Sequence, residues 1–154
     1  MKKNVRVVIC FFLIKAGSVF SGDINFINAL SSLWTTHNAT NILEFVESNV
    51  ATNTSSEVLF ARGMVAGYLE NWGRGATNYL QQSLNLVLSS GSYSDNQKSI
   101  LTNEIATTRG FFEALADDAS EPADSTAQWN TNHHTIIFNE LGDELPLLHI
   151  FNEF

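Results

Sequence analysis

The sequence predicts an all-α fold of about six helices, because three patterns coincide. From Asp23 onward, apolar residues recur at intervals of three and four, as they do on one face of a helix. Capping and glycine signals fall between these apolar stripes, where helix ends need them. Alternation of apolar and polar residues, which marks a half-buried strand, is not sustained over any useful length. We therefore expect one domain over residues 22–154, built from antiparallel helix pairs as an α-solenoid or an irregular helical bundle.

The first 21 residues predict a secretory signal peptide that is cleaved from the mature chain. Lys2, Lys3 and Arg6 form a basic start, the apolar run 7–14 follows, and small residues at 16–18 offer an exit. As a helix the apolar run covers about 12 Å, whereas the hydrocarbon core of a bilayer is about 30 Å thick. We therefore expect the mature chain to be secreted or periplasmic and to have no stable membrane span.

The first two helices of the domain are expected near residues 23–36 and 40–50. Polar residues 35–38 separate two apolar stripes with helical spacing, and each stripe is wide enough to bury one face of a helix. The stripe positions are Ile24, Ile27, Leu30, Leu33 and Trp34 in the first helix, and Leu43, Val46 and Val50 in the second.

The next two helices are expected near residues 55–72 and 75–90. Thr54 and Glu57 are spaced as a capping box, in which each side chain bonds the backbone N–H of the other residue. Between the helices, Gly73 and Gly75 are predicted to let Trp72 fold beneath a tight turn. A phosphate-binding loop is the weaker reading, because the Gly-Lys-Ser/Thr ending of such loops is missing.

The last helices are expected near residues 95–116 and 126–141, followed by a short C-terminal segment over 145–153. Further capping boxes at 94–97 and 125–128 open the two helices. The C-terminal segment is too apolar for a frayed tail, so we expect it to dock on the body of the domain. The rival explanation is that the chain is the N-terminal part of a longer protein.

The spacing of the helices and residues 58–88 resemble the tetratricopeptide family in a degenerate form. Alternate helices are separated by about 33 to 38 residues, near the repeat length of helix-turn-helix solenoids, and Ala76 opens the second helix of a pair. The chain departs from the family pattern at Gly63–Met64, at Gly67 and at Asn71, where the family has Leu-Gly, an aromatic residue and a turn glycine. The resemblance implies a right-handed array with a concave surface that binds peptides or proteins.

The charge balance argues against nucleic-acid and anionic-lipid partners. Half of the eight Lys and Arg residues lie in the first 21 residues, so four cations remain against sixteen Asp and Glu, a net charge of −12. Binding to phosphate backbones requires clustered cations. Cys10 is also lost with the signal peptide, so a core without disulfides must stabilise the mature chain.

A non-catalytic surface for an unknown protein or peptide is the function that the sequence favours, with no cofactor. Arginines can bind a carboxylate of the partner if they share a face, although Arg62 and Arg109 are also spaced for ion pairs within the chain, with acidic residues such as Glu70 and Glu113. Partner-binding candidates are Trp72, Arg62, Arg74 and Tyr68. Core packing is the competing explanation for the aromatic pair.

The alternative is a small helical enzyme or metal-binding protein that uses His133, Glu140 and His149. These residues belong to the one concentration of possible metal ligands in the sequence, with an enzyme pocket expected between the fifth and sixth helices. Neighbouring residues such as His133 and His134 point about 100° apart on a helix, and the two-histidine spacing of metalloproteases is absent. Polar residues on the surface of the domain explain the cluster better, and a Gly-x-Ser-x-Gly nucleophile motif is also missing.

Overall fold

A computed structural model describes residues 24–117 and 129–152, which form six α-helices, one 3-10 helix and no strand. The all-α prediction is confirmed for these residues. The predicted signal peptide at 1–21 and the predicted capping box at 125–128 lie outside them. The elements are α2 (Ile24–Trp34), α3 (Ala39–Thr52), α4 (Ser56–Tyr68), α5 (Gly73–Ser89), α6 (Asp95–Asp117), α7 (Thr131–Leu141) and η2 (Leu148–Asn152).

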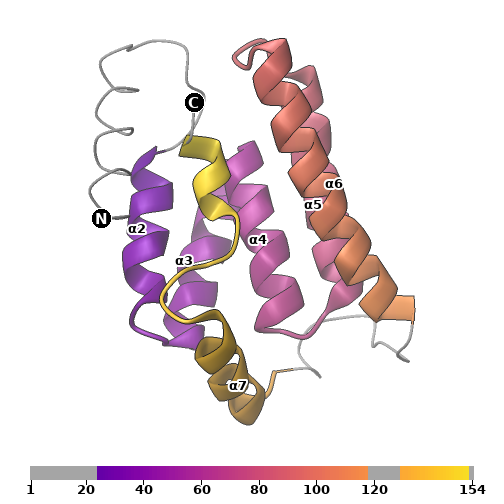
Figure 1. Cartoon of the computed structure of the whole chain (residues 1–154). Helices are drawn as coiled ribbons and strands as arrows, with labels where there is room; N and C mark the ends of the chain where they lie inside the picture. The colour runs from indigo at the N-terminus through magenta and orange to yellow at the C-terminus, as the bar shows by residue number, and fades with distance from the viewer. Residues whose placement is uncertain (1–23, 118–128, 153–154) are drawn as a thin grey trace.

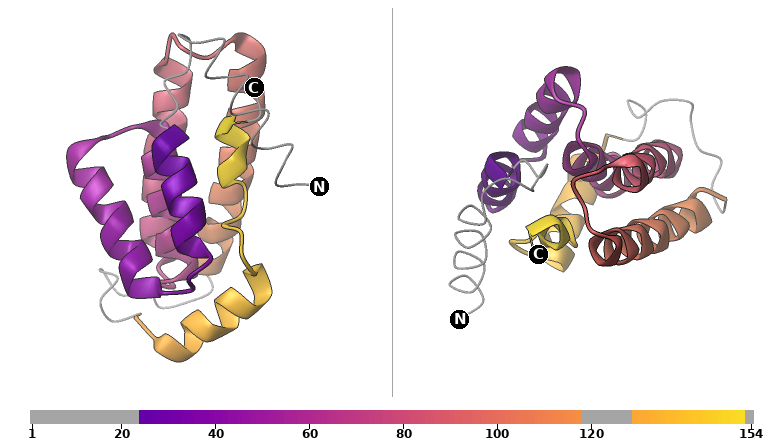
Figure 2. Two further views of the ribbon diagram at one scale, coloured as in Figure 1. Left: turned by 90° about the vertical axis from the view of Figure 1, so that its left-hand side faces the viewer. Right: turned by 90° about the horizontal axis from the view of Figure 1, so that it is seen from above.

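Helices that follow one another in the sequence also pack against one another in space. From α2 to α6 the chain runs up and down, so that α4 touches α3 and α5, and α5 touches α4 and α6 (Figure 1). Figure 2 shows α7 lying across one end of this array and η2 beside α2 and α4. This arrangement is compatible with a helical repeat fold.

Helix α4 forms the centre of the molecule. Every residue from Ser56 to Ala66 is buried, as expected for a helix that has neighbours on all sides. The largest fully buried apolar side chains come from α4 and from the elements around it: Trp34, Phe60, Phe112, Phe151, Leu30, Ile42, Met64, Leu69, Leu80, Leu101 and Ile105.

Two glycines let neighbouring side chains reach the backbone of α4. A Cβ atom at Gly63 would lie 2.8 Å from Leu80 Cγ on α5, and one at Gly67 would lie 2.2 Å from the Phe112 ring on α6. Both distances are too short for a real contact. At Gly67, where the tetratricopeptide pattern has an aromatic residue, an aromatic ring from α6 fills the space.

Two predicted capping boxes lie within the described residues, and one of them is confirmed while the other is wrong. Before α6, Ser94 N–H donates to Gln97 Oε1 at 2.8 Å and Gln97 N–H donates to Ser94 Oγ at 3.2 Å, which is the predicted capping box. Before α4, the predicted box of Thr54 and Glu57 is wrong. The N-cap there is Ser55, and the Glu57 side chain is buried in the core.

The turn between α4 and α5 starts earlier than the sequence predicted. The expected helix over 55–72 ends at Tyr68, because the chain enters the left-handed region at Asn71, with φ 49°. Trp72 is therefore the N-cap of α5 and not part of α4. A Cβ atom at Gly75 would lie 2.1 Å from the Trp72 ring, so the predicted fold of Trp72 against this glycine is confirmed.

The C-terminal elements are shorter than predicted. α7 begins at Thr131 rather than at 126, and Asn130 caps it by accepting from the N–H groups of Asn132 and His133. The segment expected over 145–153 contains the 3-10 helix η2, in which Leu148, Ile150 and Phe151 are buried. The predicted docking of this apolar segment is confirmed for its described residues.

Candidate functional site

The structure does not bring the four predicted partner-binding residues together. Arg62 is 3% exposed, and its Nη1 donates to Glu70 Oε2 at 2.5 Å. Its Nη2 donates to Glu47 Oε1 at 3.2 Å, and the guanidinium lies 4.9 Å from the centre of the Tyr79 ring. Arg62 is therefore a buried structural residue that ties α3 and α4 to the turn after α4.

Arg74 lies instead on a groove along the seam between α5 and α6, together with Arg109. The groove is open to solvent and has a volume of about 450 Å³, within the range of small-ligand pockets. It is lined by Arg74, Thr77, Asn78 and Gln81 from α5, and by Arg109, Glu113 and Ala116 from α6. Two of the three arginines that the sequence considered as carboxylate binders thus share one surface.

Arg109 is less completely paired than Arg62. Its Nη1 lies 3.8 Å from Glu113 Oε2, which is longer than the 2.7 to 2.9 Å of a charge-assisted hydrogen bond. Its Nε is shielded from solvent and has no hydrogen-bond partner among the described residues. The side chain is 33% exposed, so an Arg109–Glu113 pair of this kind stabilises the fold by about 0 to 1 kcal/mol.

Tyr68, the last residue of α4, and Trp72, the N-cap of α5, are both half-buried. The Tyr68 ring packs edge-on against Phe112 at 5.1 Å, and burial raises the pKa of its phenol. Trp72 Nε1 is shielded from solvent without a hydrogen-bond partner in the described part of the chain. Both rings act mainly as packing residues, which is the competing explanation that the sequence offered.

The histidines of α7 cap the end of α4. His133 Nε2 bonds the Tyr68 carbonyl at 2.7 Å and His134 Nε2 bonds the Leu69 carbonyl at 2.7 Å. Because a carbonyl only accepts, each Nε2 carries the proton. The pKa of His134 is lowered, chiefly by burial and further by His133, while the Leu69 carbonyl acts in the opposite direction.

The described residues show no arrangement of side chains that supports the metal-binding alternative. Within residues 24–117 and 129–152, no three His, Cys, Asp or Glu side chains gather into a set that could hold a metal ion. Glu140 is exposed on α7 and His149 lies on η2, while His133 uses its Nε2 on a backbone carbonyl.

The structure also contains a buried polar cluster around Glu57 that the sequence did not predict. Glu57 is fully buried, and its Oε1 accepts from the Tyr93 hydroxyl at 2.7 Å, while Oε2 has no partner among the described residues. Ser56 Oγ lies 3.2 Å from the same hydroxyl, and Ser83 Oγ donates to the Ser56 carbonyl at 2.7 Å. The only sequence signal was Ser83, the serine in the apolar stripe of α5.

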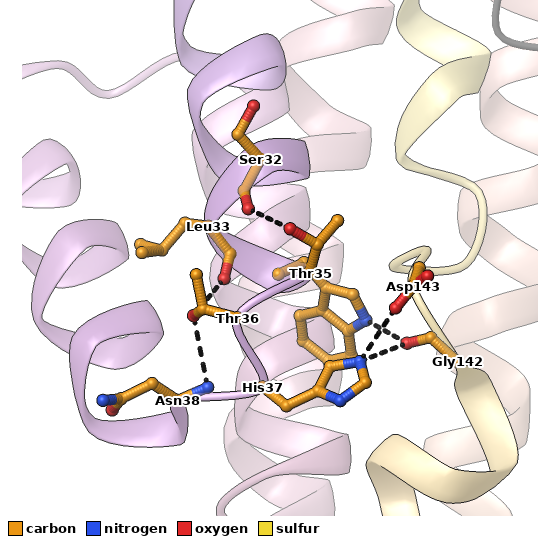
Figure 3. A network of polar contacts seen from close by, with 9 residues as sticks. Ser32, Leu33, Thr35, Thr36, His37, Asn38, Gly142 and Asp143 are labelled. Atoms are coloured by element: carbon orange, nitrogen blue, oxygen red, sulfur yellow. Dashed lines mark hydrogen bonds and ion pairs between the residues drawn. The ribbon is translucent and has the colours of Figure 1, made fainter.

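The turn between α2 and α3 holds the C-terminal end of α7 (Figure 3). Trp34 Nε1 donates to the Gly142 carbonyl at 3.0 Å, and His37 Nε2 lies 3.2 Å from the same carbonyl and 3.2 Å from Asp143 Oδ1. The His37 ring also stacks on Phe138 at 4.8 Å. This contact joins residues more than a hundred positions apart, which no local pattern could indicate.

Comparisons with protein-family models, with curated proteins and with solved structures found no match for this chain. The tetratricopeptide resemblance therefore stays a prediction from the residues. Among the described helices, none combines the length and the apolar character needed to cross a membrane.

Proposed function

We propose that this chain is a non-catalytic module that binds a peptide or a protein segment outside the cytoplasm, alone or as the N-terminal part of a longer protein. The observation that carries the proposal is Arg109, whose guanidinium lines an open groove beside Arg74 and whose Nε has no hydrogen-bond partner among the described residues. A shielded donor without a partner costs about 1 to 3 kcal/mol, so a chain retains one more readily where a ligand supplies the acceptor.

The charges of the groove indicate what kind of segment it takes. The described lining of the groove includes two arginines and one carboxylate, Glu113, in a chain whose formal net charge is −8. Arginine binds carboxylates with two parallel hydrogen bonds. The amides of Asn78 and Gln81 can donate to a peptide backbone and accept from it. We therefore expect the partner segment to be extended and to carry at least one acidic group.

A catalytic role is the less favoured alternative. An enzyme or metal-binding protein would need His133, Glu140 and His149 to converge on a substrate or an ion. His133 and His134 instead support the end of α4 through backbone carbonyls. Among the described residues that line the groove, the one hydroxyl group, Thr77 Oγ1, donates to the Gly73 carbonyl at 2.8 Å.

Selection of peptides from a random phage-displayed library on the mature protein tests the binding function. We expect enriched peptides to bind the Arg74→Gln/Arg109→Gln double variant at least about tenfold more weakly, because each lost charge-assisted hydrogen bond is worth about 1.5 to 3 kcal/mol. Lys98→Gln is the matched control, since Lys98 Nζ bonds the Leu88 carbonyl and does not line the groove. Failure to enrich any peptide, or equal binding by all three proteins, would contradict the proposal.

The location is tested separately by fractionating cells that express the full chain and sequencing the N-terminus of the protein. A start close to residue 22 in the extracytoplasmic fraction is expected. A protein that retains Met1 and stays in the cytoplasm would contradict the signal-peptide prediction and leave the binding test unaffected.

A further inference from the structure

Helix α7 is attached to the rest of the molecule through its two ends. It lies across the ends of the other helices instead of beside them (Figures 1 and 2). One end is held by His133 and His134 on the carbonyls of Tyr68 and Leu69, and the other by Trp34 and His37 on Gly142. Three of these four polar attachments are imidazoles. The buried apolar residues Ile137 and Phe138 lie toward the Gly142 end, where Phe138 packs on Trp34 and His37, so the polar hold on the other end comes from the two histidines.

The end of α7 that contacts α4 disfavours protonation of His134. His134 is 6% exposed, and its ring packs against Trp129 at 4.2 Å and lies 6.4 Å from the His133 ring. A second proton would have to sit on Nδ1, for which the described residues offer no acceptor. Burial of the new charge and repulsion from a charged His133 both oppose it, which is why the pKa of His134 is lowered.

Among the described residues, no ion pair joins a carboxylate to His134. At the end of α4, burial raises the pKa of the Tyr68 phenol, so it stays neutral, and in the turn that follows the Glu70 carboxylate is bound by Arg62. From α7, Glu140 is exposed at the opposite end of the helix. A proton on His134 therefore favours any state in which the ring is released to water.

The Gly142 end does not depend on histidine alone. His37 Nε2 lies 3.2 Å from the Gly142 carbonyl and 3.2 Å from Asp143 Oδ1. Trp34 Nε1 donates to the same carbonyl and does not titrate (Figure 3). Acid thus loosens one end of α7 and retains the other.

We propose that His133 and His134 make α7 a proton-operated latch, which is docked on α4 while the His134 imidazole is neutral and swings away when that ring is protonated, with the Trp34–Gly142 contact as the pivot. The undocked form binds more protons than the docked form. The docked form therefore loses stability as the pH falls below the ordinary imidazole value of about 6.5, and the loss levels off below the lowered pKa of the docked ring.

Hydrogen–deuterium exchange of the mature protein, corrected for intrinsic rates, tests the latch. Between about pH 6.5 and 5.5 we expect the opening of residues 131–141 to increase several-fold, up to about tenfold for one linked proton, while α4 and α5 stay protected. His134→Gln keeps a donor for the Leu69 carbonyl and does not titrate, so its opening should not change with pH. His149→Gln, on η2, is the control and should behave as the wild type does.

Carbon and nitrogen NMR of the wild-type imidazoles supplies a second readout that does not depend on how well His134→Gln docks. The titration of His134 should coincide with the loss of protection in α7. The latch is overturned if the wild type opens to the same extent at both pH values, if His134→Gln keeps the pH dependence, or if His134 titrates without release of α7.

Discussion

Helix α5 meets its two neighbours in contrasting ways. Toward α4 the contact is closed, because Gly63 brings the backbone of α4 against Leu80 and the carbonyl of Ala76. Toward α6 the seam opens into a groove of about 450 Å³ with Arg74 and Arg109 on its walls. One side of the helix therefore holds the fold together, and the other leaves charged groups accessible.

Two arginines, Arg62 and Arg109, show the same contrast between a closed and an open site. Arg62 is enclosed by two carboxylates and an aromatic ring, so its charge is satisfied by the chain itself. Arg109 has one carboxylate at 3.8 Å and a shielded Nε without a partner in the described residues. An arginine in a helix thus indicates a binding surface only where the folded chain does not already supply its acceptors.

The largest expected loss of stability is on the α4 side of α5, where Arg62 lies. Arg62→Ala leaves Glu70, which is 2% exposed, as a buried carboxylate without its cation, so we expect a loss of about 3 to 5 kcal/mol in the free energy of unfolding. Urea unfolding measures this loss. The double variant Arg62→Met/Glu70→Leu should recover part of it, and a single variant as stable as the wild type would contradict a structural role for Arg62.

The buried hydroxyl of Tyr93 should have the next largest effect. Tyr93→Phe removes the hydrogen bond to Glu57 and leaves both oxygens of a fully buried carboxyl group without a described partner, which costs about 1 to 3 kcal/mol. Thermal or urea unfolding checks the value. Tyr79→Phe is a suitable control, because Tyr79 meets Arg62 through its ring and not through its hydroxyl.

Two glycine substitutions should differ in sign. Gly63→Ala places a Cβ atom 2.8 Å from Leu80 Cγ and 3.2 Å from the Ala76 carbonyl, so we expect a net loss of about 1 kcal/mol or more. Gly110→Ala meets nothing within 4 Å on α6 and should gain about 0.5 to 1 kcal/mol from helix propensity. Equal shifts of the melting temperature in the two variants would break the distinction between packed and open helix faces.

The smallest effect on stability is expected at the open side. Arg109→Gln removes a weak, partly exposed ion pair, so the free energy of unfolding should change by less than about 1 kcal/mol. Peptide binding should nevertheless weaken strongly. A large loss of stability in this variant would move Arg109 into the same structural class as Arg62.

The sequence predicted the fold class well because helical periodicity and exposed caps are local. Ser94 and Gln97 pair with each other on the exposed surface at the start of α6. The Glu57 prediction failed because Tyr93, 36 residues away, binds its carboxyl group. Local pattern likewise could not reveal that Arg62 is enclosed by Glu47 and Glu70, or that Arg74 and Arg109 meet across a seam. These contacts depend on how the helices pack, and helix packing cannot be predicted from the local pattern of a single sequence.

The contrast between the arginines can be measured directly by NMR of their Nε–Hε groups during titration with the tightest-binding selected peptide. The signals of Arg74 and Arg109 should shift to saturation with the affinity of the peptide, while that of Arg62 should stay in place. A shift at Arg62 alone, or saturation of binding with no change at Arg109, would contradict the assignment of the α5–α6 groove as the binding surface.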